Sequence, residues 1–269
     1  MPAANAAPGR RAARCALHGP RQRCGYPRWV PEDRDDWVAA MEEAKVLHPP
    51  LAPPTACSRC LRPLEADKRQ WGTCYPCGHH HPHTLAGISA VTYGAAGTRP
   101  WDFFTTTKFE QTTADKLASF VNGIAAMLSA TVESEQPSFS DGNANHIVVP
   151  LPSSHGLIRR CLDAIEVNGW PSLRVVGALI AAERPRQTGL DETSRREAAA
   201  GKYTASAAVA DKHVLLVDDA YTSGYTIHDA ARAVIAADAA SVAAVVYARR
   251  IHPEAMAVYR AERGEDDGD

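Results

Sequence analysis

The sequence predicts an α/β fold with a parallel sheet, preceded by a small module that is rich in cysteine. From residue 87 onward, short β-branched runs alternate with helical segments, which is typical of a parallel sheet with helices on its faces. Two Cys-x-x-Cys pairs lie upstream of these segments. A length of 269 residues with 45% hydrophobic residues is enough for a full α/β core and a small accessory module.

We expect four segments along the chain. They are a basic arm with a short amphipathic helix (32–46) and a proline-rich linker over 1–54, a zinc-ribbon module over 55–84, the α/β domain over 85–260, and an acidic tail over 261–269. The first 30 residues hold six arginines and no acidic residue, as a transit peptide would. They lack an amphipathic apolar face, so a disordered basic arm is the favoured interpretation.

The composition is that of an ordinary soluble protein. A formal net charge of −2 gives no reason for global attraction to nucleic acids or membranes. No window approaches the roughly 20 apolar residues that a membrane-spanning helix needs. Seven cysteines without a secretory signal favour a reducing compartment, and we expect the protein in the cytoplasm.

Four of the cysteines have the spacing of a structural zinc site. Cys57 and Cys60 form one pair, Cys74 and Cys77 form another, and thirteen residues separate the pairs. Four thiolates close the tetrahedron around Zn²⁺, which leaves no open position for catalysis. The following histidines are then surplus and solvent-exposed: His79, His80, His81 and His83. Other cysteines are assigned less sharply: Cys15 and Cys24 with His18 lack an evident fourth ligand, and Cys161 is expected to be a buried helix residue.

The spacing of the apolar residues predicts the elements of the α/β domain in order. Strands are expected at 87–94, 146–150, 174–180, 214–217 and 241–248, and helices at 114–130, 158–166 and 227–237. In the clearest helix, apolar side chains recur on one face: Leu117, Phe120, Val121, Ile124 and Leu128.

The stretch VLLVDDAYTSGYT (214–226) carries the strongest functional signal. Two adjacent acids, Asp218 and Asp219, end a buried strand, and a small hydroxyl-rich loop then runs into a helix. The free N–H groups at a helix N-terminus favour an anion such as phosphate, and two carboxylates can accept hydrogen bonds from a diol. A phosphate beside a diol is a ribose 5-phosphate. The alternative is a strand ending in an N-cap aspartate, with an ordinary turn.

This stretch resembles the phosphoribosyl diphosphate (PRPP) motif of type I phosphoribosyltransferases. The resemblance implies that Asp218 and Asp219 bind the ribose hydroxyls and that Mg²⁺ bridges ribose and diphosphate oxygens. It implies that the 5-phosphate is bound by the loop, which consists of Thr222, Ser223, Gly224, Tyr225 and Thr226. It also implies transfer of the phosphoribosyl group to a nitrogen nucleophile with release of diphosphate.

From Cys57 onward the chain resembles the competence protein ComF family of phosphoribosyltransferases. The segment VTYGAAGTRPWDFFTTTKF (91–109) matches the family's lysine–aromatic pair at Lys108, and IVVPLPSS (147–154) stands where the family has its diphosphate loop. The residues implied in that loop are Pro152, Ser153 and Ser154. The segment ERPRQTGLDETSRREAAAGKY (183–203) resembles the family's arginine- and glutamine-containing segment. It implies Arg184, Gln187 and Arg195 at the PRPP.

The basic segment 183–203 also has a physical rationale of its own. A mobile basic loop can neutralise the charge that develops on a departing diphosphate and can exclude water. The alternative is a solvated charged loop.

Two departures from the family support an alternative function. The run SSHGLIRRC (153–161) replaces the family's usual sequence after the diphosphate loop, and Ala198 stands where the family has asparagine. The alternative is a PRPP-binding protein without catalysis, or a protein of DNA uptake, in which the zinc module and the basic arm contact single-stranded nucleic acid or a protein partner. The sequence does not specify the acceptor.

Overall fold

The computed structural model describes residues 41, 44, 46–79, 84–109, 114–135, 145–153, 156–167, 174–182 and 191–265. The helix expected over 32–46 lies almost entirely outside these residues, as do the basic arm and Cys15, His18 and Cys24. Within the described part of the chain, no helix is both long enough and apolar enough to cross a membrane.

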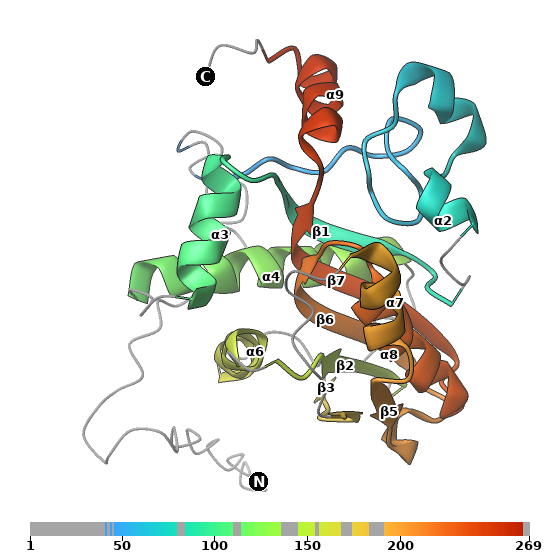
Figure 1. The fold of residues 1–269 in the computed structure, drawn as a ribbon. Helices are drawn as coiled ribbons and strands as arrows, with labels where there is room; N and C mark the ends of the chain where they lie inside the picture. The colour runs from blue at the N-terminus through green and yellow to red at the C-terminus, as the bar shows by residue number, and fades with distance from the viewer. Residues whose placement is uncertain are drawn as a thin grey trace, which may run out of the picture.

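A parallel sheet forms the centre of the molecule (Figure 1). Its five strands follow the order β1 (Ile88–Gly94), β7 (Ser241–Arg250), β6 (His213–Tyr221), β2 (His146–Pro150) and β3 (Arg174–Val175). Each strand joins the next through helices or long loops, as parallel pairing requires. The long strands β6 and β7 lie at the middle and are almost wholly buried.

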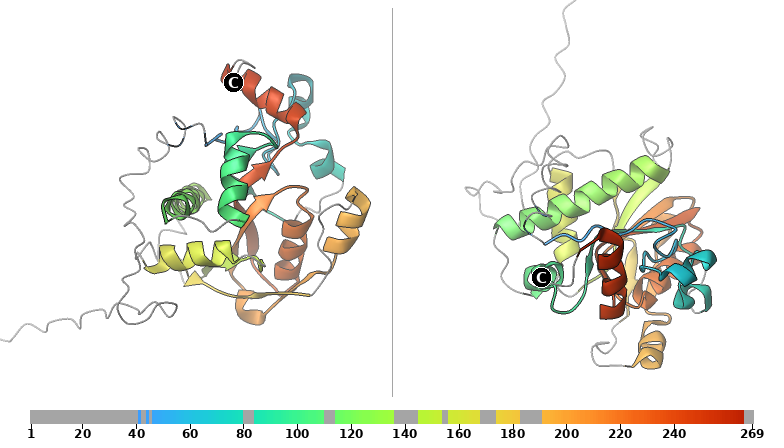
Figure 2. Two further views of the ribbon diagram at one scale, coloured as in Figure 1. Left: turned by 60° about the vertical axis from the view of Figure 1, so that its left-hand side comes forward. Right: turned by 90° about the horizontal axis from the view of Figure 1, so that it is seen from above.

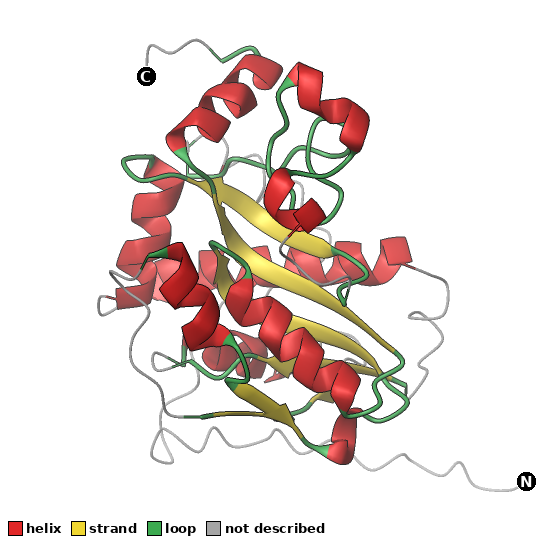
Figure 3. Cartoon of the chain, turned by 45° about the vertical axis from the view of Figure 1, so that its right-hand side comes forward, coloured by secondary structure: helices red, strands yellow, loops and turns green. Residues whose placement is uncertain are grey.

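Both faces of the sheet are covered, which explains the near-continuous apolar runs in its strands. Helices α3 (Arg99–Phe109), α4 (Ala114–Glu135) and α6 (Leu157–Val167) lie on one face, and α8 (Tyr225–Ala236) lies on the other, together with the cysteine module (Figures 2 and 3). Strand β6 alternates between the two cores: Val214 and Leu216 face α8, whereas Leu215 and Val217 face α4 and α6.

Helix α4 confirms the expected amphipathic helix and extends it to Glu135. Phe120 and Ile124 are fully buried, and the Phe120 ring stacks on Tyr247 of β7 with centroids 3.8 Å apart. The buried position expected for Cys161 is also confirmed, on α6.

A third cluster closes one end of the sheet. Helix α9 (Pro253–Arg263) packs Met256 and Tyr259 against Tyr93 of β1, whose ring meets Tyr259 edge-on at 5.2 Å. Short helices in the described residues include η2 (Ala66–Trp71), α2 (Tyr75–His79) and η3 (Ala207–Val209).

The prediction of one strand over 174–180 is wrong. The chain forms two short strands there, β3 in the parallel sheet and β4 (Leu179–Ala181), which pairs antiparallel with β5 (Tyr203–Ala205). The apolar run is interrupted at Gly177, where the Ala178 amide donates to the Val176 carbonyl and turns the chain out of the main sheet. The local pattern could not show this change of sheet, because both strands have the same β-branched character.

Two further boundaries differ from expectation. Strand β6 continues four residues beyond Val217 to Tyr221, so the two acids lie within the strand and not after it. Within the basic segment expected to be a loop, residues 192–199 form helix α7 (Glu192–Ala199). Asp191 caps this helix by accepting a hydrogen bond from the Ser194 amide at 2.8 Å.

Candidate functional site

The acid pair lies where β6 meets the last turn of α3. Asp219 is 5% exposed, and its Oδ2 atom lies 2.7 Å from Lys108 Nζ. The Asp219 amide donates to Asp218 Oδ1 at 2.8 Å. The structure therefore brings Lys108 to the acid pair, although Lys108 lies 110 residues before Asp218 and 111 residues before Asp219 in the sequence. The cation that two adjacent carboxylates require comes from α3.

The protonation of the pair is unusual. Burial and the neighbouring Asp219 carboxylate raise the pKa of Asp218 to about 8, and the charges of Lys108 and Lys202 only partly oppose this. Asp218 keeps some solvent access, but protein encloses its carboxyl group. At neutral pH, Asp218 is therefore largely protonated until a ligand supplies a cation or hydrogen-bond donors.

The loop after β6 has the backbone of an anion site. Gly224 has φ of +88° and is the N-cap of α8, with no side chain capping the helix. A Cβ at this position would lie 2.1 Å from Tyr221 Oη, so only glycine fits. Thr222 is exposed, Ser223 is half-buried, and Tyr225 is buried in the first turn of the helix with Thr226 beside it.

A buried arginine that the sequence analysis missed holds this loop from below. Arg249 of β7 is 6% exposed, and its Nη1 donates to the carbonyls of Tyr221 at 3.1 Å and Thr222 at 2.9 Å. Its guanidinium also lies over the Tyr221 ring, 4.5 Å from the centroid. The only signal in the sequence is a charged residue directly after a long apolar strand.

The second expected loop lies beside the first. The Leu151 amide donates to the Val217 carbonyl at 2.9 Å, which brings Pro152 and Ser153 next to the acid-bearing half of β6. Ser154, Arg184 and Gln187 lie outside the described residues, and of Arg195 only its place in α7 is described.

The end of the basic segment is tied to α8. Asp229, which the sequence analysis missed, accepts hydrogen bonds from the amides of Gly201 at 2.8 Å and Tyr203 at 2.9 Å. Lys202 stands between them, and its charge partly opposes the rise in the pKa of Asp218. The chain thus returns from α7 to the acid pair at a defined point.

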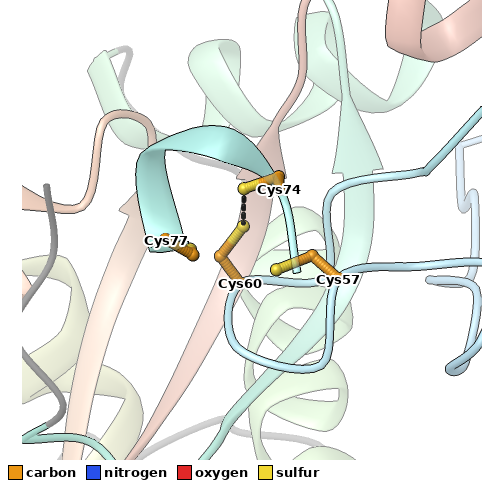
Figure 4. Close-up of side chains that lie close together, drawn as sticks. All are labelled: Cys57, Cys60, Cys74 and Cys77. Carbon is orange, nitrogen blue, oxygen red and sulfur yellow. Dashed lines mark hydrogen bonds between the residues drawn. The ribbon is translucent and has the colours of Figure 1, made fainter. Parts of the chain in front are cut away.

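The four cysteines of the N-terminal module come together in space (Figure 4). Their sulfur atoms all lie within 4.8 Å of one another, and Cys60 Sγ is 3.5 Å from Cys74 Sγ. Tetrahedral zinc with bonds of about 2.3 Å requires sulfur separations of roughly 3.8 Å. The arrangement fits Zn²⁺ because four buried thiols converge on one point.

Matching turns in the two Cys-x-x-Cys pairs create this arrangement. The Leu61 amide donates to the Cys57 carbonyl at 2.9 Å, and the Gly78 amide donates to the Cys74 carbonyl at 3.0 Å. Each turn aims two sulfur atoms in the same direction. His79 is exposed and stacks on Tyr75, outside the cluster, and the other expected surplus histidines lie outside the described residues.

Hydrogen bonds and charges among the four thiols favour binding of a cation at the cluster. Hydrogen bonds with the Cys57, Cys74 and Cys77 thiols, together with the charge of Arg249, lower the pKa of Cys60 well below its usual value. Hydrogen bonds with the Cys57 and Cys60 thiols, and to a smaller extent the charge of Cys60, raise the pKa values of Cys74 and Cys77 and so oppose the ionisation of these thiols. A divalent ion removes that opposition.

Comparison with known protein families finds a match over the C-terminal part of the chain. Residues 140–266, which include β6, the Gly224 loop and α8, match the family model described as a phosphoribosyl transferase domain. The expected fold class is confirmed. It is an α/β fold with a five-stranded parallel sheet, part of which lies in the matched phosphoribosyl transferase domain, and a small N-terminal module of clustered cysteines.

Solved structures give only distant similarity, and no curated protein matches the chain. An allosteric regulatory enzyme of purine biosynthesis shares 17% identity at a TM-score of 0.33, over 53% of this chain and 30% of the enzyme. A hypoxanthine phosphoribosyltransferase from Staphylococcus aureus shares 13% identity at a TM-score of 0.31, over 50% of this chain and 74% of that protein.

Proposed function

We propose that the protein binds PRPP with Mg²⁺ and transfers its phosphoribosyl group to a nitrogen nucleophile, with release of diphosphate. One observation carries the proposal: an acid pair with a lysine partner lies directly before a glycine loop that opens onto the N-terminus of α8. Diol and phosphate recognition are thereby joined in one site. The match over 140–266 supports the same chemistry.

Each part of the site has a defined task. The carboxylates of Asp218 and Asp219 accept hydrogen bonds from the ribose hydroxyls, and the loop from Thr222 to Thr226 donates to the 5-phosphate. Oxygen donors of this kind fit Mg²⁺, which supplies charge neutralisation for the diphosphate when bound.

Basic side chains assist the departure of diphosphate. Lys108 contacts Asp219 directly, and Lys202 stands within electrostatic reach of Asp218. Together with Arg184, Gln187 and Arg195, they stabilise the negative charge that develops as the bond to C1 of ribose breaks. The loop of Pro152, Ser153 and Ser154 is assigned to the diphosphate in this proposal. No step requires a covalent intermediate with the protein.

The cysteine module has a structural task in this proposal. Cys57, Cys60, Cys74 and Cys77 hold one Zn²⁺, and all four ligands are protein thiolates. The module's buried side chains share a core with residues of β6 and α8, so zinc stabilises the catalytic domain as well as the module. The free thiols suit a reducing compartment, and we propose a cytoplasmic location.

Calorimetry with PRPP and Mg²⁺ tests the proposed function. The wild-type protein should bind, and Asp218→Asn/Asp219→Asn should weaken binding at least about 100-fold, or about 2.7 kcal/mol. Asp211→Asn is the matched control because Asp211 is exposed and its left-handed backbone, with φ of +58°, suits asparagine. Undetectable binding by the wild type, or unchanged affinity in the double variant, would reject the site. Binding in the wild type would justify a screen of amines and bases for diphosphate release.

Binding should also release a proton near neutral pH. The raised pKa of Asp218, about 8, means that the free protein holds a proton there at pH 7. Ligand hydroxyls and Mg²⁺ favour the ionised carboxylate, so apparent PRPP affinity should rise about tenfold between pH 7 and pH 9.

The number of protons released on binding is obtained from the binding enthalpies measured in buffers that differ in ionisation enthalpy. The wild type should release close to one proton at pH 7, and Asp218→Asn should release much less. Equal proton release by the two proteins would show that Asp218 is already ionised before binding.

A second candidate function follows from the surface of the cysteine module. A cavity of about 590 Å³ lies between the module and α9, and it is bordered by the exposed rings of Trp71 and Tyr75. Exposed aromatic rings stack on unpaired bases. Arg62 and Lys68 at its border are balanced by Glu65 and Glu254, which disfavours a polyanion. Salt-dependent binding of a labelled oligo-dT, lost in Trp71→Ala/Tyr75→Ala, would favour the nucleic-acid function over catalysis alone.

A further inference from the structure

The guanidinium of Arg249 touches both the cysteine module and the loop after β6. Its Nε donates to the Cys60 carbonyl at 2.7 Å, and its Nη2 lies 3.6 Å from Cys60 Sγ. Its Nη1 donates to the carbonyls of Tyr221 and Thr222, on the side of the Gly224 loop. One buried side chain therefore joins residues that stand more than 160 positions apart in the sequence.

The buried positive charge of Arg249 must be compensated by the groups around it. The guanidinium is always protonated and is 6% exposed, so its charge needs compensation inside the protein. Its described partners are backbone carbonyls, the Tyr221 ring and the Cys60 sulfur, and none of these is a carboxylate. A four-thiolate zinc site carries a net negative charge, and its sulfur atoms commonly accept such second-layer hydrogen bonds.

The loop depends on the same side chain. Tyr221 lies between the Arg249 guanidinium and His228, whose Nε2 is 3.2 Å from Tyr221 Oη. Gly224 closes directly over the Tyr221 ring. A shift of Arg249 would release the carbonyls of Tyr221 and Thr222 and the ring on which the loop rests.

We propose that Arg249 is a positioning residue that couples closure of the four-cysteine site to the order of the loop 222–226. With the cysteines gathered around a metal, Cys60 holds two of the guanidinium nitrogens, and the third nitrogen holds the loop carbonyls. When the module opens, Arg249 loses its Cys60 partners, and the loop loses its support. The structural metal thereby sets the geometry of a site that it does not enter. The expected effect on PRPP rests on the proposed function, whereas the coupling itself does not.

Hydrogen exchange measures the coupling without any ligand. The amide of His228 reports the order of the loop 222–226, because it donates to the Gly224 carbonyl at 2.9 Å. In the zinc-loaded wild type this amide should exchange slowly, and removal of zinc by a chelator should speed its exchange at least tenfold. Arg249→Lys should show fast loop exchange while zinc is still bound, because an ammonium cannot reproduce the planar fork of donors. Peptides from the buried face of α4 serve as the internal reference, since their exchange reports unfolding of the whole domain.

A matched variant and three outcomes decide the matter. Arg263→Lys changes an exposed arginine on α9 in the same way and should leave loop exchange unaltered. The coupling is overturned if zinc removal speeds exchange only in residues 57–78, if Arg249→Lys leaves the loop as slow as in the wild type, or if the purified protein holds no zinc. Should Arg249→Lys fail to fold, the zinc-removal comparison in the wild type still decides.

PRPP separates this inference from the proposed function. If both hold, saturating PRPP with Mg²⁺ should slow the transfer of zinc to a colorimetric chelator several-fold in the wild type but not in Arg249→Lys, since coupling is reciprocal. Zinc-dependent loop exchange without PRPP binding would retain the coupling and reject the proposed ligand. If PRPP affinity is the same with and without zinc and in Arg249→Lys, the proposed ligand is retained and the coupling is rejected.

Discussion

Replacing Gly224 by alanine is expected to abolish PRPP binding while leaving most of the protein folded. The residue has φ of +88°, where a Cβ costs about 1–2 kcal/mol, and that Cβ would lie 2.1 Å from Tyr221 Oη. The tyrosine ring cannot swing away, because it is 2% exposed and packs against Arg249 and His228. The loop must move instead. We expect a loss of about 2–4 kcal/mol in unfolding free energy and at least about a 100-fold loss in PRPP affinity.

Gly264→Ala is the matched control for this prediction. Gly264 also has a positive φ, +66°, and caps α9, but nothing lies within 4 Å of its added Cβ. That variant should lose only about 1 kcal/mol, and its PRPP affinity should equal that of the wild type. Calorimetric titration and thermal unfolding of both variants provide the comparison. Retained PRPP affinity in Gly224→Ala would mean that the loop tolerates displacement and does not hold the 5-phosphate by its backbone.

Cys60→Ser is expected to remove zinc and to destabilise the α/β domain as well as the cysteine module. Cys60 is 2% exposed, and it belongs to the same buried cluster as Tyr221 and Ile227. Loss of a structural metal is among the few changes that cost more than about 4 kcal/mol. Zinc content should fall from one ion per chain to nearly none, and the unfolding midpoint of the whole domain should fall with it.

A buried cysteine outside the cluster provides the control. Cys161→Ser on α6 buries a hydroxyl group and should cost about 1–2 kcal/mol without changing the zinc content. Metal analysis and chemical denaturation of the two variants test both points. A zinc-free Cys60→Ser protein with wild-type stability would mean that the module is an appendage and not part of the domain core.

The candidate site was predictable wherever its parts are close in sequence. The acids, the hydroxyl-rich loop and Gly224 lie within one strand-to-helix connection, so their order carries the chemistry. The two Cys-x-x-Cys turns are equally local. Lys108 was assigned only through resemblance to a family, since nothing near it in the sequence points to an acid 111 residues away.

The helices and strands were likewise predictable where they depend on local sequence, and not where they depend on pairing between distant segments. Periodicity predicted α4, α6, α8 and the long strands, because a buried face imposes its spacing on each element separately. It missed α3, α7 and α9, and it fused β3 with β4. Pairing partners are a property of the sheet, and two adjacent apolar runs give no local sign of joining different sheets.

The sequence by itself therefore determined the α/β class, the cysteine site and the strand that carries Asp218 and Asp219. Only the tertiary structure decided that Lys108 neutralises Asp219, that Asp229 secures the end of the basic segment, and that Arg249 spans the cysteine module and the loop. The physical reason is that these contacts depend on the strand order β1-β7-β6, which places distant segments side by side. A local pattern specifies what each segment buries, whereas the packed sheet specifies which buried groups meet.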